Sequence, residues 1–100
     1  MTLTPAQKKQ FKALGHTLKP VVLLGEQGLT EGVLKEADRA LTDHELIKIK
    51  FNFAERDERQ AAMAELATEL RATLVQNVGK MGLFYRKARQ PNPKLSNLIS

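Results

Sequence analysis

The spacing of the apolar positions changes along the chain and predicts alternating helices and strands. Over residues 5–14, 30–41 and 57–70, the apolar residues recur every three or four positions, which is typical of a helix with one buried side. Thr4 stands before a proline, and a hydroxyl cap followed by proline is a common helix start. Gly15 suits the left-handed residue that often ends a helix. The sequence therefore predicts three helices.

Four other segments are predicted to be strands. Residues 21–24 form a short, wholly apolar run that begins with β-branched residues, which is typical of a buried strand. Apolar and polar residues alternate over 45–53, which indicates a strand with one buried and one exposed face. Two more strands are expected at 73–78 and at about 83–86. The short, glycine-rich connection 79–82 should join them as a hairpin.

The predicted order of elements, α-β-α-β-α-β-β, restricts the topology. Strand–helix–strand connections favour parallel pairs with right-handed crossovers, and the final hairpin adds an antiparallel strand. We therefore expect an α/β fold of the two-layer α+β kind, with helices mainly on one face of a four-stranded mixed sheet. Residues 1–88 should form a single domain, and residues 89–100 a flexible tail that is basic and contains proline.

The composition excludes several classes of protein. With 100 residues the chain can form one core, and its 42% hydrophobic and 27% charged residues are ordinary values for a globular domain. No apolar stretch approaches the ~18 residues that span a bilayer, and the first residues lack the pattern of a secretory signal. There is no cysteine for disulfides or thiolate metal sites. We expect a monomeric, cytoplasmic protein that does not contact membranes.

Charge is distributed unevenly along the chain, whose formal net charge is +5. All 11 acidic residues lie between Glu26 and Glu69, whereas residues 1–25 and 70–100 contain lysine and arginine but no acid. Such segregation is typical of polyanion binding, provided that the fold brings the two basic ends together. Charge alone does not distinguish this function from lysines that serve only solubility.

The most informative local motif is Gly25-Glu26-Gln27-Gly28, between a predicted strand and a helix that Thr30 caps. Glycines let the backbone approach a ligand closely, and a helix start offers free N–H groups and a favourable dipole to a phosphate. A GxxG loop holds the nucleic-acid backbone in KH domains. By itself the pattern is more often a simple turn. It also lacks the remaining residues of a P-loop or a dinucleotide fingerprint.

Basic side chains on several predicted elements are further candidates for phosphate contacts. They are Lys8, Lys9, Lys12, Lys19, Lys48, Lys50, Lys80, Arg86, Lys87 and Arg89. Lys48 and Lys50 share the polar face of the alternating strand, but the sequence leaves open whether this face lies beside the GxxG loop. Tyr85 could stack on a base, although one aromatic residue in a strand is more often half-buried packing.

The residues that most often serve catalysis or metal binding are sparse. His16 and His44 lack metal-ligand spacing, and the serines, Ser96 and Ser100, lie in the predicted tail. A glutamate follows His44, but neighbours in sequence do not make a catalytic pair. We expect both histidines to cap or pack rather than to react. The chain is therefore predicted to have no enzymatic activity, no cofactor and no metal site.

Three blocks of sequence, in order, closely resemble one known family. They are LKPVVLLG at 18–25, GEQGLT at 25–30 and HELIKIK at 44–50. They resemble the CRM domain (chloroplast RNA splicing and ribosome maturation), and most closely its stand-alone bacterial form, the YhbY proteins. The resemblance covers about residues 2–87. It implies an α/β fold similar to the C-terminal domain of bacterial translation initiation factor three.

The resemblance also implies a function. Members of this family bind RNA through the GxxG loop and the basic surface around it, and the bacterial form associates with precursors of the large ribosomal subunit as an assembly factor. This assigns the loop role to residues 25–28 and a supporting role to Lys19 and Thr30, with ribosomal RNA as the partner. Glu26 departs from the small, polar or basic residues of relatives, so the loop amides rather than this side chain should contact phosphate.

A second hypothesis belongs to a different class of function. The same basic surface could dock on acidic ribosomal or assembly proteins, and contact with RNA would then be incidental. The two hypotheses differ in whether purified RNA binds strongly and saturably.

Overall fold

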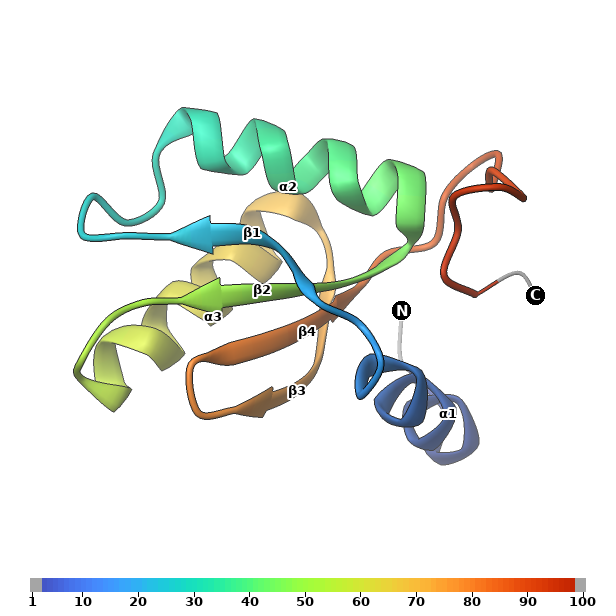
Figure 1. Ribbon diagram of the computed structural model, residues 1–100, viewed down its shortest axis with the longest axis horizontal. Coiled ribbons are helices and arrows are strands. Elements are labelled where there is room, and N and C mark those ends of the chain that lie inside the picture. Colours follow the sequence, from blue (N-terminus) through green and yellow to red (C-terminus); the bar gives the residue numbers. More distant parts are fainter. Residues whose placement is uncertain (1–2, 99–100) are drawn as a thin grey trace.

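The computed structural model describes residues 3–98 and contains three helices and four strands (Figure 1). In chain order the elements are α1 (Pro5–Gly15), β1 (Pro20–Leu24), α2 (Glu31–His44), β2 (Leu46–Phe51), α3 (Arg56–Leu70), β3 (Thr73–Val78) and β4 (Met81–Tyr85). The sheet has the order β1-β2-β4-β3, in which β1 and β2 are parallel and the other pairs antiparallel. The predicted α/β fold with a four-stranded mixed sheet is confirmed.

Local signals in the sequence explain where the first two helices begin. The Thr4 hydroxyl accepts a hydrogen bond from the Gln7 N–H at 3.1 Å, and the Gln7 side chain accepts one from the Thr4 N–H at 3.0 Å. At the start of α2 the Thr30 hydroxyl accepts from the Val33 N–H at 3.2 Å. Both predicted caps are therefore confirmed. Helix α2 continues past the expected end to His44, because no proline or glycine interrupts it.

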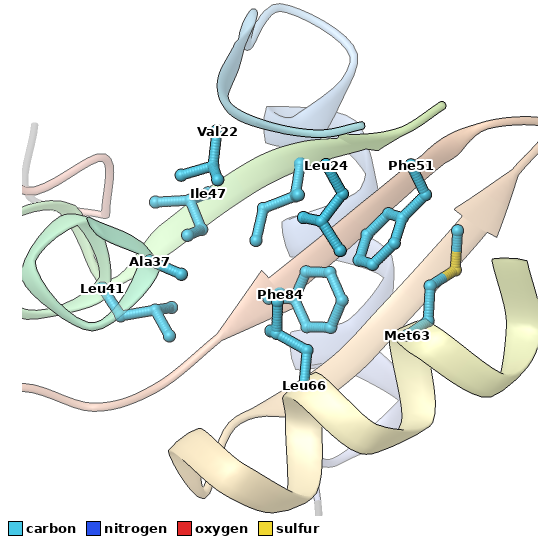
Figure 2. Packing of buried hydrophobic residues seen from close by; sticks show 10 residues of the cluster. Val22, Leu24, Ala37, Leu41, Ile47, Phe51, Met63, Leu66 and Phe84 are labelled. Atoms are coloured by element: carbon cyan, nitrogen blue, oxygen red, sulfur yellow. The ribbon is translucent and has the colours of Figure 1, made fainter. Parts of the chain in front are cut away.

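The main core lies between one face of the sheet and helices α2 and α3, and we call this the covered face. It contains the alternate strand residues Val22, Leu24, Ile47, Ile49, Phe51 and Phe84. Figure 2 shows Met63 and Leu66 of α3 pointing toward the rings of Phe51 and Phe84, whose centroids are 5.9 Å apart. Fully burying a side chain of this size contributes roughly 1.5–3 kcal/mol, so this cluster dominates the stability of the fold.

The opposite side of the sheet, which we call the open face, is only partly covered. It presents Leu23, Leu46, Lys48, Lys50, Gln76, Val78, Met81, Leu83 and Tyr85. Helix α1 packs here through Phe11, in a second cluster with Leu46, Val75 and Leu83. A Cβ at Gly15 would lie 2.6 Å from Leu83 Cδ2, so glycine is what allows this close approach. The helices thus lie mainly on one face, with α1 as the exception.

The apolar run at 21–24 is not a fully buried strand, contrary to our prediction. Val22 and Leu24 are buried, but Val21 is 46% exposed and Leu23 is 59% exposed. Successive residues of a strand point to opposite faces, and no helix covers the open face at β1, which is an edge strand. The run would have been buried on both sides only if helices had packed on both faces.

The segment that follows β4, as far as residue 98, folds back on the start of β2. The flexibility expected of residues 89–100 stays a prediction. The Ser96 hydroxyl donates to Glu45 Oε1 at 2.8 Å, and the Ala88 N–H donates to Glu45 Oε2 at 3.0 Å. Glu45 is only 4% exposed and has a positive φ of 62° where α2 ends. His44 Nδ1 donates to the Leu95 carbonyl at 2.7 Å, which gives this histidine a structural role. A buried carboxylate requires hydrogen-bond donors. This segment supplies them to Glu45 although it has no regular secondary structure.

Arg86 connects three elements through one guanidinium group. Its Nη1 donates to Asp38 Oδ1 at 2.7 Å and to the Leu70 carbonyl at 3.0 Å. Its Nη2 donates to the Asp38 carbonyl and to the Thr42 hydroxyl, both at 3.0 Å. The group thereby ties α2 and the last turn of α3 to the end of β4. A solvated role in binding phosphate, as the sequence suggested, would require these bonds to break.

Replacing Arg86 with alanine should therefore lower the free energy of unfolding by about 1–3 kcal/mol, because charge-assisted bonds to both helices are lost. Urea denaturation measures this change. The matched control is Lys87→Ala, an exposed neighbour that should shift stability by no more than about 0.5 kcal/mol. Equal effects of the two substitutions would contradict the structural role of Arg86.

Candidate nucleic-acid interface

The charge that is distributed unevenly along the sequence is also distributed unevenly between the two faces of the sheet. Helix α1 and all four strands contain no aspartate or glutamate. The acidic residues lie in α2, in α3 and in the connections that precede α2, β2 and α3. Because α2 and α3 pack on the covered face and α1 on the open face, the acid-free segments are brought together on one side. This side is the natural surface for a polyanion.

The GxxG loop is a closed turn that leads directly into α2. The Gly28 N–H donates to the Gly25 carbonyl at 3.0 Å, and the Thr30 N–H donates to the Gly28 carbonyl at 3.0 Å. Gly28 has a φ of 71°, a conformation that strains other residues. Gly25 has no such constraint, and a Cβ placed on either glycine would meet nothing within 4 Å. The turn therefore needs one of its glycines for its own shape, and both leave the backbone accessible.

The loop forms a shallow hollow of about 430 Å³ whose lining offers hydrogen-bond donors. Residues 25–28 form its rim together with Leu23, Thr30 and Val33. Within residues 3–98, the N–H groups of Glu26, Gln27 and Leu29 have no acceptor in the protein. Free amides beside a helix N-terminus favour an anion through hydrogen bonds and the helix dipole. The hollow can thus hold one phosphate group, provided that the exposed Glu26 carboxylate points away from it.

Strand register places Lys50 beside this hollow. Leu23, which lines the hollow, pairs with Lys50 on the neighbouring strand, so the two side chains lie on the same face. Lys48 lies two residues before Lys50, also on the open face. Neither lysine forms an ion pair with any residue between 3 and 98. The question that the sequence left open is therefore answered: both lysines share a face that continues into the loop.

Lys80 lies at the same end of the sheet as the loop. Its carbonyl accepts from the Phe51 N–H at 2.7 Å, and its ammonium group donates to Asn52 Oδ1 at 3.1 Å. The Asn52 N–H in turn donates to the Leu24 carbonyl, directly before the loop, at 2.9 Å. In Figure 1 the connections β1–α2, β2–α3 and β3–β4 all lie at the left end. One end of the sheet therefore carries both the glycine loop and a lysine of the hairpin.

The remaining lysines of the amino-terminal part border the other end of the open face. Lys8 and Lys9 are exposed on α1, and Lys12 is half-buried on the same helix. Lys19 is exposed immediately before β1, so it is separated from the loop by the length of that strand, about 17 Å. Together with Lys48 and Lys50 between the two ends, these lysines extend the basic surface across the open face.

Three predicted site residues lie away from the loop, just after β4. Arg86 is held by α2 and α3, as described above. Lys87 and Arg89 are exposed, but they follow β4 at the end opposite Lys80. The described contacts thus give Arg86 a structural role, and a role in RNA binding for Lys87 and Arg89, at the end of the sheet where Lys19 also lies, stays a prediction.

Tyr85 is packed rather than available for stacking on a base. Its ring lies 4.7 Å from that of Phe11, centroid to centroid, beneath α1. Burial, and secondly the negative charge of Glu45, raise the pKa of its hydroxyl above the ordinary value of 10.0. The packing alternative that the sequence allowed is therefore the one observed. The side chains that sequence reasoning missed are Leu23, Gln76 and Met81, which face the exposed part of the sheet.

The raised pKa gives a direct test, because Tyr85 is the sole tyrosine and the chain has no tryptophan. Ultraviolet titration of the folded protein should give a midpoint above 10.0, and urea-unfolded protein one near 10.0. Since the folded state retains the phenol proton more strongly, stability should fall as the pH rises past the unfolded value. A folded midpoint equal to or below the unfolded one would contradict the burial of this hydroxyl.

Neither a metal centre nor a membrane-spanning helix is found between residues 3 and 98. No three or more His, Asp or Glu side chains in this part of the chain are placed to hold a metal ion together. None of its helices is long and apolar enough to cross a bilayer. His16 is exposed at the end of α1, and His44 is bonded to the C-terminal segment.

The sequence matches the family model described as the CRS1 / YhbY (CRM) domain over residues 3–86. The matched range contains every helix and strand of the structure and the whole GxxG loop. It ends directly after β4, before the segment that folds back on Glu45.

Similar proteins from several bacteria extend over nearly the same length. A Pseudomonas aeruginosa protein named "probable RNA-binding protein" is 59% identical over 98 residues, 98% of this chain and 94% of that protein. A Haemophilus influenzae protein named "RNA-binding protein" is 43% identical over 94 residues, 94% of this chain and 95% of that protein. The solution structure of a Staphylococcus aureus protein superimposes with a TM-score of 0.78 at 30% identity, covering 89% of this chain and 93% of that chain.

Proposed function

This chain belongs to the CRS1 / YhbY (CRM) domain family, and we propose that it binds RNA without catalysing a reaction. Its partner is ribosomal RNA in the precursor of the large ribosomal subunit, where it acts as a monomeric, cytoplasmic assembly factor. The observation that carries the proposal is the acid-free side of the sheet, which joins unpaired lysines to a hollow of free amides. The names of the relatives in Pseudomonas aeruginosa and Haemophilus influenzae support RNA as the ligand.

Recognition on this surface uses the RNA backbone and its shape. Lys48, Lys50 and Lys80 neutralise phosphates and release counterions, which supplies most of the affinity. The loop amides and the start of α2 then fix the position of one phosphate, because their hydrogen bonds are directional. Such contacts read little sequence, so a structured RNA is selected by the arrangement of its phosphates.

The assembly role rests on the resemblance to the stand-alone bacterial form of the family. Crosslinking the protein to RNA in a cell lysate and sequencing the bound fragments tests this part of the proposal. Enrichment of large-subunit precursor RNA is expected, and enrichment of unrelated messenger RNA would contradict it.

Gly25→Leu is the sharpest test of the loop. Gly25 has an ordinary φ and open space around its α-carbon, so a leucine should fit the fold but occupy the hollow. Affinity for a structured ribosomal RNA fragment should fall about tenfold or more, the equivalent of one lost charge-assisted hydrogen bond. Fluorescence anisotropy measures the affinity, and thermal denaturation checks that folding is intact.

The matched control is Ala64→Leu, which adds the same side chain at an exposed position of α3. It should bind RNA as the parent does. Parental affinity of a folded Gly25→Leu variant would remove the loop from the interface. Gly28 is a weaker test, because its positive φ strains any replacement and a loss of binding would then have two causes.

Salt dependence separates RNA binding from docking on a protein. Because each neutralised phosphate contributes about 0.7–0.9 to the slope of log K against log salt, replacing Lys48 and Lys50 with glutamine should reduce that slope by about 1.4–1.8. Replacing Lys35, an exposed lysine of α2, should leave the slope unchanged. If purified RNA binds only weakly and without saturation, the protein-docking hypothesis is favoured instead.

A further inference from the structure

We propose that a pocket between the end of α1 and the open face accepts one unstacked base of the bound RNA. This inference rests on the proposed function and deepens it, since it adds a base site to a surface that otherwise contacts phosphates. The ligand class is a single heterocyclic base in a single-stranded or bulged segment.

The pocket lies on the open face, where the part of the sheet that α1 covers meets the part that α1 leaves uncovered. Its volume is about 150 Å³, and Gly15 closes it on the side of α1. Its remaining lining is His16, Lys48, Gln76, Val78, Met81 and Leu83. Because α1 ends at Gly15, the strands beyond it have no helix above them, and the side chains of β3 and β4 remain accessible there.

A β-bulge in β3 turns the side chain of Gln76 toward the open face, where the pocket lies. Leu74 pairs with Phe84 on the covered face, and the register then shifts so that Gln76 pairs with Leu83 on the open face. The extra residue, Val75, is buried beneath α1. Without the shift, Gln76 would have paired with Gly82 and pointed to the covered face. Bulges often re-aim a side chain at a functional position.

The volume of the pocket is sufficient for one aromatic ring. A cavity of about 150 Å³ is large enough for a six-membered aromatic ring, whereas drug-sized ligands need roughly 300 Å³ or more. The pocket opens to solvent, so the sugar and phosphate of the nucleotide can remain outside. A complete nucleotide cofactor would not fit within it.

The lining offers apolar contacts for the face of a base and hydrogen bonds for its polar edge. Val78, Met81 and Leu83 offer apolar walls, and the polarisable thioether of methionine makes favourable contacts with aromatic rings. Gln76 is half-buried and has no side-chain hydrogen bond within residues 3–98, so its amide can both donate to and accept from the edge of a base. Val78 is 62% exposed, so its side chain is accessible to a ligand.

Charge favours RNA over other occupants of this pocket. Lys48 lines it, Lys50 lies two residues further along β2, and no acidic residue belongs to α1 or to any strand of the sheet. An RNA strand that runs from the loop hollow toward the lysines of α1 therefore crosses the pocket. The ring would enter the apolar part while its own phosphate remains beside the lysines.

The proposal is tested by combining a pocket-filling substitution with removal of the bases. Val78→Phe adds a ring at an exposed position, so it should fill the pocket without disturbing the core. Binding of a short single-stranded RNA should weaken about fivefold or more, as the loss of one base contact implies. Binding of the same ribose-phosphate strand without bases should not change. Isothermal titration of the full chain measures both.

Two further variants keep the test decisive. Gln76→Ala should also weaken binding of the RNA but not of the base-free strand, and it adds no bulk that could hinder folding. The matched control is Asn77→Ala, the exposed neighbour that pairs with Gly82, which should alter neither affinity.

The outcomes separate this inference from the proposed function. If Val78→Phe and Gln76→Ala leave RNA binding intact, or weaken both strands equally, the base site is wrong. The proposed function still holds in that case, provided that Gly25→Leu weakens RNA binding. If the parent protein binds neither strand, the proposed function fails as well.

Discussion

The packing of α2 and α3 against one face of the sheet is the constraint on which the rest of the structure depends. Burial of Leu24, Ile49, Phe51 and Phe84 under these helices fixes which residues of each strand point inward. Because the side chains of a strand alternate, the intervening residues are forced to the other face. The positions of Lys48 and Lys50 on the open face thus follow from a core to which they do not belong.

The same packing separates the charges of the molecule. Acidic residues are carried by the two helices of the covered face and by connections, and the acid-free helix α1 docks on the opposite side through Phe11 and Gly15. Electrostatic attraction of a polyanion therefore has one favoured side. The glycine loop lies at the edge of this side, where β1 passes into α2. In the proposed function, the sheet supplies the long-range attraction and the loop places one phosphate.

Sequence reasoning succeeded where a local pattern is enough to specify the structure. Hydroxyl caps at Thr4 and Thr30, the alternation over β2 and the turn at 25–28 each depend on residues within a few positions of one another. It failed at 21–24, because an apolar run does not reveal whether one or both faces of its strand are covered. It also gave no sign of the bonds that hold Arg86, because its partners Asp38 and Leu70 are distant in sequence.

The sequence by itself determined the helices and strands, their order, the segregation of charge and the resemblance to one family, because these follow from spacing, composition and short motifs. The tertiary structure alone decided which face α1 covers, how the lysines of β2 adjoin the loop, and which basic residues are bound within the fold. It also decided that a bulge in β3 turns Gln76 toward the open face. These features depend on register and packing between segments that are distant in the chain, and no local pattern encodes them.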